Sequence, residues 1–542
     1  MNRLPLRIAV FLLGVAAAFP APGDDAAAPS MKPAERKSPE AMTGTKPGDE
    51  AMTGRGKPGG ELKTTPDEPA AAPPKRPSTG GTAALSPAAE ARLDAMARRI
   101  DALLEAAWAD RGIVPAGPAA DERFLRRVSL DLIGRIPRVS EIREFLGDAA
   151  ADRRRQVVER LLASREHADY MGALWQGAFA PDIDGNAGSL VAAWFARQFG
   201  DGVAYDRVAR NVVLGNTKDG RDANGGLAID RTPTELAAAV SRTFLGMQIQ
   251  CAECHKHPTD VWTQDDFWGF AAFFGPVTHP ATKATVQPRF LGDAPAVATS
   301  RPAREQLAEW LASPANPWFA KAMVNRLWGL LFGAGIVNPV DDLGSHNPPA
   351  HAGLLDELAG FFAAGGWNHR DVLRVLARTR AYGLSSGDGR ADRLFAAMPL
   401  EPLNAVQLYN SLAVAYHAAK VSPNGMQAVG RAPATQFLAK FRTAPGQQRE
   451  YTAGIPQAIA LMNGQMFDPM RVVYHEAMIA SRTDPERIET LFLATLSRPP
   501  VHAELATCLE VLGRETTAAG RRLALVDIHW ALVNSAEFAF SP

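Results

Sequence analysis

Residues 250–258, QCAECHKHP, gather two of the three cysteines and two of the eleven histidines of the 542-residue chain. Cys251 and Cys254 lie three positions apart, His255 follows directly, and His257 comes two residues later. This C-x-x-C-H spacing is typical of covalent haem c attachment. Two thiols one helical turn apart form thioethers with the haem vinyl groups, and the adjacent imidazole binds the iron as its proximal ligand. The spacing therefore predicts haem c on Cys251 and Cys254, with His255 on the iron.

Three other kinds of site use the same residue types. A zinc ion has four candidate ligands here, namely Cys251, Cys254, His255 and His257. Structural zinc sites draw their ligands from two separated pairs, so four donors within seven residues disfavour zinc. A thioredoxin-like redox pair needs a strand–helix context that this segment lacks. A disulfide between Cys251 and Cys254 stays open, because exported C-x-x-C pairs oxidise.

The segments that flank the motif suggest roles for its neighbours. Residues 231–250 have helical spacing with Thr232 or Thr234 as N-cap, so the motif lies near a helix end. His257 is too close to His255 to reach the opposite face of the haem, so it hydrogen-bonds locally or serves another metal site. Asp260 could orient a histidine ring N–H. The candidates for the second axial position are Met247, His279, Met462 and Met466.

The first 86 residues predict export and a tether. Residues 1–21 combine a basic start, a short apolar run and small residues at Ala16 and Ala18, the pattern of a secretory signal peptide. The run is shorter than the ~20 apolar residues of a spanning helix, so we expect no transmembrane span in the mature chain, with an uncleaved anchor as the alternative. Residues 22–86 are rich in Pro, Gly, Ala and Thr, which predicts a disordered low-complexity linker. We expect an exported protein of the periplasm or cell envelope.

Beyond residue 86, apolar residues recur at helical spacing almost throughout. Leu93, Met96 and Ile100 mark the buried stripe of a first amphipathic helix, and later segments repeat this pattern. A stretch near 276–303 is rich in Pro, Ala and Thr and lacks helical period, apart from a candidate edge strand at 284–290. We predict a mainly α fold with two helical domains, residues 87–285 and 303–542, joined by a linker at 286–302.

A second polar cluster lies in the second half of the chain. Residues 341–351, DDLGSHNPPAH, hold two carboxylates and two histidines in a loop just before a predicted helix. Carboxylates and imidazoles can bind a metal or pass protons. The structural alternative is that Asn347 and His351 lock the loop and cap the helix.

Composition and missing motifs exclude several functional classes. The chain carries 58 Lys+Arg and 58 Asp+Glu, so no net basic field favours a nucleic-acid partner. It has no G-x-x-x-x-G-K-[ST] or H-E-x-x-H motif, and no catalytic residue is assigned. Cys508 lies in a helical pattern near the C-terminus and is expected to be a buried, inert thiol. Aromatic side chains after the C-x-x-C-H motif either wall a haem or form core, namely Trp262, Phe267, Trp268, Phe270, Phe273 and Phe274.

Several long phrases together resemble a known pair of domains. FLRRVSLDLIGRIPRVSEIREFL and FLGMQIQCAECHKHPTDVWTQDDFWGFAAFFG are similar to the planctomycete cytochrome-C-like domain of unknown function, the second family of that name. LAEWLASPANPWFAKAMVNRLWGLLFGAGIVNPVDDLGSHN resembles the planctomycete-specific C-terminal domain of unknown function that follows it. The resemblance covers nearly all of residues 90–540 and implies an exported helical protein. It also singles out Arg127 and Asp131, whose spacing on one helix predicts a surface ion pair or an anchor for a neighbouring loop.

The leading hypothesis is therefore an exported haem c protein that transfers electrons to a redox or envelope protein partner. One alternative is a non-haem structural or interaction protein with a Cys251–Cys254 disulfide. The other is a metal-dependent envelope enzyme that uses His255, His257 and residues of the 341–351 loop.

Overall fold

The computed structural model describes residues 85–183, 185–215, 231–292, 296–314, 316–387, 394–416 and 483–542. In its first half the elements are α2 (Pro87–Asp110), α3 (Asp121–Ile133), α4 (Val139–Gly147), α5 (Arg153–Ala163), α6 (Arg165–Phe179), α7 (Gly185–Gly200), α8 (Tyr205–Leu214), α10 (Pro233–Val240), the π-helix η2 (Ser241–Leu245), the 3-10 helix η3 (Ile249–Glu253) and α11 (Gln264–Ala271). In its second half they are α12 (Ala303–Leu311), α13 (Phe319–Phe332), α14 (Ala352–Ala364), α15 (His369–Arg378), β1 (Glu401–Pro402), α16 (Ala405–Ala415), α20 (Asp484–Leu496), α21 (His502–Gly513), α22 (Ala518–Val533), α23 (Ala536–Ala539) and β2 (Phe540–Ser541). The prediction of a mainly α fold is confirmed; the predicted signal peptide and most of the predicted linker lie outside the described residues.

Local sequence signals set several helix ends. Gly134 ends α3 with φ +66°, a left-handed conformation that favours glycine. A Cβ at this position would lie 2.3 Å from the ring of Tyr170, so the close approach of α6 also requires glycine. At α10, the Thr232 side chain accepts from the amide of Glu235, whose carboxylate accepts in return from the amide of Thr232. This capping box satisfies two amides at the helix start and confirms Thr232 as the N-cap.

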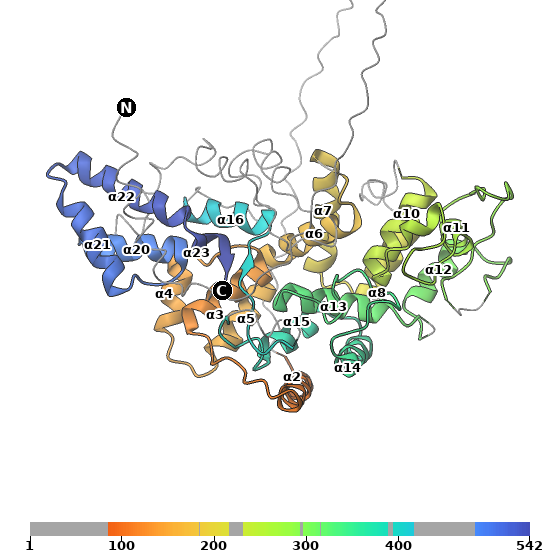
Figure 1. Cartoon of the computed structure of the whole chain (residues 1–542), viewed down its shortest axis with the longest axis horizontal. Coiled ribbons are helices and arrows are strands. Elements are labelled where there is room, and N and C mark those ends of the chain that lie inside the picture. The colour runs from red at the N-terminus through yellow and green to blue at the C-terminus, as the bar shows by residue number, and fades with distance from the viewer. Residues whose placement is uncertain are drawn as a thin grey trace, which may run out of the picture. The chain divides into compact units, whose positions relative to one another are not determined.

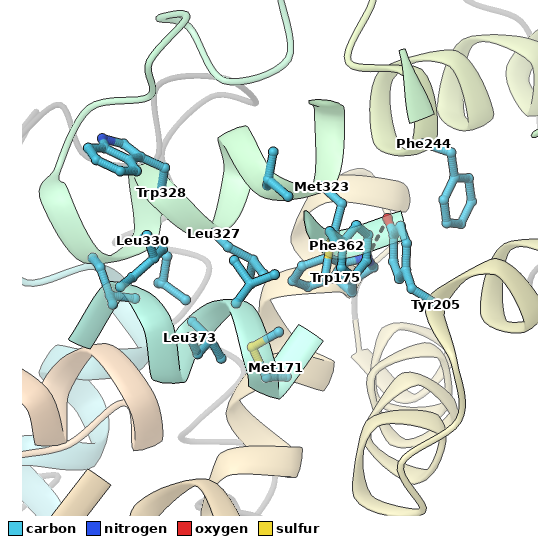
Figure 2. Close-up of a cluster of buried hydrophobic side chains, with 14 of the residues drawn as sticks. Met171, Trp175, Tyr205, Phe244, Met323, Leu327, Trp328, Leu330, Phe362 and Leu373 are labelled. Carbon is cyan, nitrogen blue, oxygen red and sulfur yellow. Dashed lines mark hydrogen bonds between the residues drawn. The ribbon is translucent and has the colours of Figure 1, made fainter. Parts of the chain in front are cut away.

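Helices from both halves of the chain share one core. Leu85–Pro542 is a single compact unit, in which α13 and α15 lie side by side (Figure 1). Figure 2 shows how Met171 and Trp175 of α6 meet Met323 and Leu327 of α13, with Leu373 of α15 beside them. The Trp175 indole N–H donates to the Tyr205 hydroxyl at 3.4 Å, which satisfies a polar group in an otherwise apolar cluster (Figure 2).

The β structure is small. Strands β1 and β2 pair antiparallel, with Glu401 opposite Ser541 and Pro402 opposite Phe540. The predicted edge strand at 284–290 was wrong, because this segment makes one isolated antiparallel bridge, between Thr278 and Thr285, and no ladder. The proline at position 288 lacks the backbone donor that a longer ladder needs.

Two buried arginines of α3 connect the halves of the chain. Arg126 donates to the carbonyl oxygens of Thr495 and Phe538, and Arg127 donates to those of Tyr382 and Leu384. The prediction of a surface ion pair between Arg127 and Asp131 was wrong, since their exposed fractions are 1% and 5%. Asp131 instead accepts from the Tyr382 hydroxyl at 2.8 Å. The alternative, that these residues anchor a neighbouring segment, is confirmed.

Within the part of the chain that the structure describes, no helix is both long enough and apolar enough to cross a membrane.

Candidate functional site

The C-x-x-C-H motif lies in a tight turn, residues 251–255, which we call the CxxCH turn. Helix α10 continues into η2, and the chain then reverses at Gly246, whose φ is +63°. Short π-helical segments frequently occur at functional sites. The 3-10 helix η3 begins three residues after Gly246 and includes Cys251, and Cys254 follows its end. The helix that the sequence predicts over residues 231–250 is therefore regular only in α10, and a π-helix, a left-handed glycine and a 3-10 helix replace it after Val240.

The turn exposes its thiols and buries the residue between them. Cys251 and Cys254 are both free and exposed, whereas Ala252 is fully buried in the core. The Trp268 indole N–H donates to the carbonyl oxygen of Glu253 at 3.1 Å, and the Gln264 amide donates to that of Cys254 at 2.6 Å. Helix α11 therefore holds the backbone of the turn while both cysteine residues stay exposed.

His255 is exposed and its ring is oriented by the backbone. Its Nδ1 lies 2.7 Å from the carbonyl oxygen of Lys256, so Nδ1 carries the hydrogen and donates it. In a neutral imidazole, Nε2 then carries the lone pair. Histidines that bind metals usually donate their other ring N–H to a carbonyl or carboxylate in this way. Two free thiols and an imidazole with an available Nε2 fit the requirements of a covalently bound haem.

His257 has a structural role in the loop that follows. Its Nδ1 accepts the amide N–H of Asp260 at 3.0 Å, and its own amide donates to the carbonyl oxygen of Trp262 at 2.9 Å. Because Nδ1 is the acceptor, Nε2 carries the hydrogen in the neutral ring. This arrangement favours local hydrogen bonding over the prediction that His257 is a metal ligand.

The carboxylate of Asp260 faces the second half of the chain. Its Oδ1 accepts from the Ser345 hydroxyl at 2.9 Å and from the amide of Val261 at 2.8 Å. The prediction that this carboxylate orients a ring N–H of His255 or His257 was wrong, because it is the backbone amide of Asp260 that binds His257. Burial raises the pKa of the Asp260 carboxyl, but the hydrogen bonds from Val261 and Ser345 and the nearby His346 outweigh burial and lower the pKa below its usual value.

The predicted polar loop at 341–351 lies against the residues that follow the CxxCH turn. The rings of His257 and His346 are 6.4 Å apart between centroids. His346 Nε2 lies 3.2 Å from Asp342 Oδ2, and its Nδ1 lies 3.8 Å from Asp260 Oδ2. The Asn347 amide donates to the carbonyl oxygen of Asp342, and His351 Nδ1 accepts from the amide of Leu354. Asn347 and His351 therefore have the loop-locking and capping roles that the structural alternative assigned to them.

The described residues contain no group of three or more His, Cys, Asp or Glu side chains placed to hold a metal ion. The alternative that combines His257 with the 341–351 loop is correct about their proximity. It gains no ligand set from that proximity, because His257 Nδ1 accepts the amide of Asp260 and both ring nitrogens of His346 face carboxylate oxygens.

Comparison with known families matches two successive segments of the chain. Residues 99–279 match the family PSCyt2, described as a protein of unknown function (DUF1549), and residues 303–436 match PSD1, described as a protein of unknown function (DUF1553). The chain carries a PSCyt2 domain followed by a PSD1 domain. No curated protein and no solved structure matches the chain. The CxxCH turn belongs to the PSCyt2 domain and the 341–351 loop to the PSD1 domain.

The predicted second axial ligands of the PSCyt2 domain are engaged elsewhere. Met247 is buried in the core, with an exposed fraction of 2%. His279 Nδ1 accepts the amides of Ala281 and Thr282, so its Nε2 carries the hydrogen. That nitrogen lies 3.2 Å from Asp265 Oδ1 but out of line for a hydrogen bond. Met462 and Met466 lie outside the described residues.

The aromatic residues after the CxxCH turn form core. Trp262, Phe267 and Phe270 are buried, and Trp268 is half-buried. Phe270 packs edge-on against Phe273 and Phe274, and Trp262 packs against Trp318 of the PSD1 domain. Of the two readings of these residues, the structure supports the core.

Cys508 in α21 is fully buried and free. Burial, with a smaller contribution from Glu504, raises the pKa of its thiol to about 12. A thiol that is both buried and protonated is unreactive, as the sequence predicts.

Proposed function

We propose that the protein is an exported c-type haem protein that transfers electrons. Cys251 and Cys254 form the thioethers, and His255 binds the iron through Nε2. A covalently bound haem supplies a one-electron Fe(III)/Fe(II) couple. The residues of this chain bind the porphyrin, orient the proximal imidazole and keep the attachment point at the surface, where a redox or envelope protein partner can approach it.

The observation that carries the proposal is the hydrogen bond from His255 Nδ1 to the carbonyl oxygen of Lys256. It orients the ring and leaves the lone pair on Nε2, on the residue that directly follows Cys254. The exposed, free state of both thiols also supports it, because a thioether can form only on a sulfur atom that the haem vinyl groups can reach. The name of the PSCyt2 family is consistent with a cytochrome-like domain.

Export is the second part of the proposal. It rests on the basic and apolar N-terminal segment and on the chemistry of the motif, since haem is attached to such motifs outside the cytoplasm.

The test is expression with the native N-terminus in a host that matures c-type cytochromes, followed by acid–acetone extraction and absorption spectroscopy. The proposal predicts a Soret band that stays with the protein, is lost in Cys251→Ala and persists in Cys508→Ala. The matched cysteine control matters because Cys508 is buried far from solvent. A wild-type protein without covalent haem after competent maturation would overturn the proposal and favour the disulfide alternative.

A further inference from the structure

We propose that a loop of the PSD1 domain supports the haem attachment site in the PSCyt2 domain. This loop comprises residues 341–347 and is called the 341–347 loop. Its residues hold the CxxCH turn on both sides and fix the direction in which the thiols and His255 point. The consequence for haem rests on the function proposed above, whereas the holding of the turn stands on contacts in the haem-free protein.

On the N-terminal side of the turn, the 341–347 loop binds the reversal at Gly246. The amide of Leu343 donates to the carbonyl oxygen of Gly246 at 2.7 Å, and the Gln248 side chain donates to Asp341 Oδ1 at 3.0 Å. Asp341 is 2% exposed. A buried carboxylate without a donor is costly, so the bond to Gln248 is strongly favoured. These contacts fix the backbone three to five residues before Cys251.

On the C-terminal side, the same loop binds Asp260. The Ser345 hydroxyl donates to Asp260 Oδ1, and only 5% of the Asp260 side chain is exposed. Gly344 packs so closely that a Cβ there would lie 2.5 Å from Asp260 Oδ2. Asp260 in turn holds His257 through its amide. The contact therefore reaches back to within two residues of His255.

The two sets of contacts bracket the reactive residues. Cys251, Cys254 and His255 are exposed between them, while the backbone on each side is tied to one short loop of the other domain. Sites that bind a rigid group depend on a supporting layer that holds the binding side chains near one geometry. The residues of the 341–347 loop are positioning residues, because none of the contacts described here reaches a thiol or the ring of His255.

His346 adds a further contact between the 341–347 loop and Asp260. Its Nε2 lies 3.2 Å from Asp342 Oδ2, within hydrogen-bond distance, and its Nδ1 lies 3.8 Å from Asp260 Oδ2. His346 thus links the two domains electrostatically beside the turn.

The holding role is tested in the full-length haem-free protein by amide hydrogen exchange over residues 244–262. Gln248→Ala removes the side-chain hydrogen bond on the N-terminal side, and Ser345→Ala removes the hydroxyl hydrogen bond on the C-terminal side. The matched controls are Gln156→Ala, which removes a Gln–Asp hydrogen bond to Asp152 on α5, and Ser189→Ala, which removes a hydroxyl bond to the Gly185 carbonyl on α7. We expect about fivefold faster exchange for each bond removed, the factor that corresponds to about 1 kcal/mol.

The expected pattern is specific. Gln248→Ala speeds exchange at the amide of Met247, Ser345→Ala speeds it at the amides of His257 and Asp260, and the controls leave all three unchanged. Alkylation of the buried thiol of Cys508 stays as slow as in the wild type, which separates local loosening from global unfolding. Wild-type exchange in both variants, or loosening that also exposes Cys508, overturns the inference.

The consequence for haem is tested in matured protein. Looser positioning admits water around the proximal imidazole, and solvent exposure near an iron centre favours its oxidised, more charged state. We expect the midpoint potential of the haem to be lower in Gln248→Ala/Ser345→Ala than in the wild type. The control Gln156→Ala/Ser189→Ala should have the wild-type potential. A wild type that binds no haem refutes the proposed function alone, because the exchange experiment still decides the holding role. Haem-loaded protein with equal potentials in both pairs overturns the haem consequence.

Discussion

The Ser345 hydroxyl lies 2.9 Å from the Asp260 carboxylate, 85 positions away in the sequence and in the other domain. This hydrogen bond places the PSD1 domain directly beside the CxxCH turn of the PSCyt2 domain. The two domains occur in this order in one chain, and their contact at the candidate site gives a physical reason for them to act together.

A substitution at Gly246 tests how closely the chain reversal before the CxxCH turn packs against Leu343 of the PSD1 domain. Gly246→Ala introduces a Cβ at φ +63° and only 2.9 Å from Leu343 Cδ1. We expect a loss of about 2–3 kcal/mol in the free energy of unfolding, measured by urea titration, of which the left-handed backbone alone accounts for about 1 kcal/mol. Gly112→Ala is the matched control, since Gly112 also has φ +63° but no atom within 4 Å of its added Cβ. Equal losses in the two variants would contradict the close packing at Leu343.

The three thiols should react at very different rates. In the reduced, haem-free protein, iodoacetamide at mildly alkaline pH should modify Cys251 and Cys254 readily and Cys508 only after denaturation. The reason is that the thiolate is the reactive form, while burial raises the pKa of the Cys508 thiol to about 12. Peptide mass spectrometry over time measures this order. Rapid modification of Cys508 in the folded protein would show that α21 opens readily.

Acid should destabilise the fold through two buried histidines. His167 of α6 and His369 of α15 have parallel rings with centroids 5.8 Å apart, and His167 Nδ1 donates to the Leu132 carbonyl oxygen. Burial is the main cause that lowers the pKa of His167 from 6.5 to about 4, with Arg370 and Arg374 adding repulsion. Burial and the neighbouring His167 hold the pKa of His369 well below its usual value.

The sign of the pH dependence follows from these directions. Below about pH 6.5 the histidines of the unfolded chain bind protons, whereas the buried histidines of the folded protein do not. The free energy of unfolding is therefore highest above that pH and falls as the pH drops toward 4. We expect His167 alone to cost about 2 kcal/mol between pH 7 and pH 5. Urea titrations at these two pH values measure it, with His369→Gln flattening the slope and the exposed control His502→Gln preserving it. A slope that is unchanged in His369→Gln would refute this source of acid sensitivity.

Substitution of Arg135 should cause one of the largest losses in the free energy of unfolding. Its guanidinium is 2% exposed and binds the carboxylates of Glu141 and Glu166 at 2.8 Å each. Burial raises the pKa of Glu141, but Arg135 outweighs burial and lowers it to about 2. Arg135→Ala leaves Glu141 and Glu166 with only the more exposed Arg138 as a charged partner and should cost about 3 kcal/mol in urea titration. Arg99→Ala breaks an exposed pair with Glu357 and should cost far less, because solvent screens the pair, and similar losses for the two variants would contradict this reasoning.

Local signals in the sequence predict much of this fold. The apolar period of α2, the capping box at Thr232 and the left-handed Gly134 mark helices near their observed bounds, because each depends on residues within a few positions of one another. Reasoning from local spacing alone gave the wrong prediction of a surface ion pair between Arg127 and Asp131. Their spacing permits a surface pair, and only tertiary packing reveals that both side chains are buried and bind Tyr382.

The candidate site likewise has a part that local sequence predicts and a part that depends on tertiary contacts. The C-x-x-C-H spacing identifies the thiols and the proximal imidazole, since that chemistry is contained in five consecutive residues. Nothing in the sequence indicated the roles of Gln248, Ser345 and Gly344. Those roles depend on contacts between residues that lie about ninety positions apart. The richness of the 341–351 loop in His and Asp marked the right loop. It did not show that these residues contact the neighbouring domain beside the CxxCH turn.

The proposed function depends most directly on what is bonded to Cys251 and Cys254 in the matured protein. Trypsin cleaves after Arg242 and Lys256 and releases residues 243–256, which contain both thiols and His255. Mass spectrometry of this peptide, from protein matured in a cytochrome c-competent host, should show the added mass of one haem. A peptide with two free thiols, or one lighter by the two thiol hydrogens of a disulfide, would contradict the account.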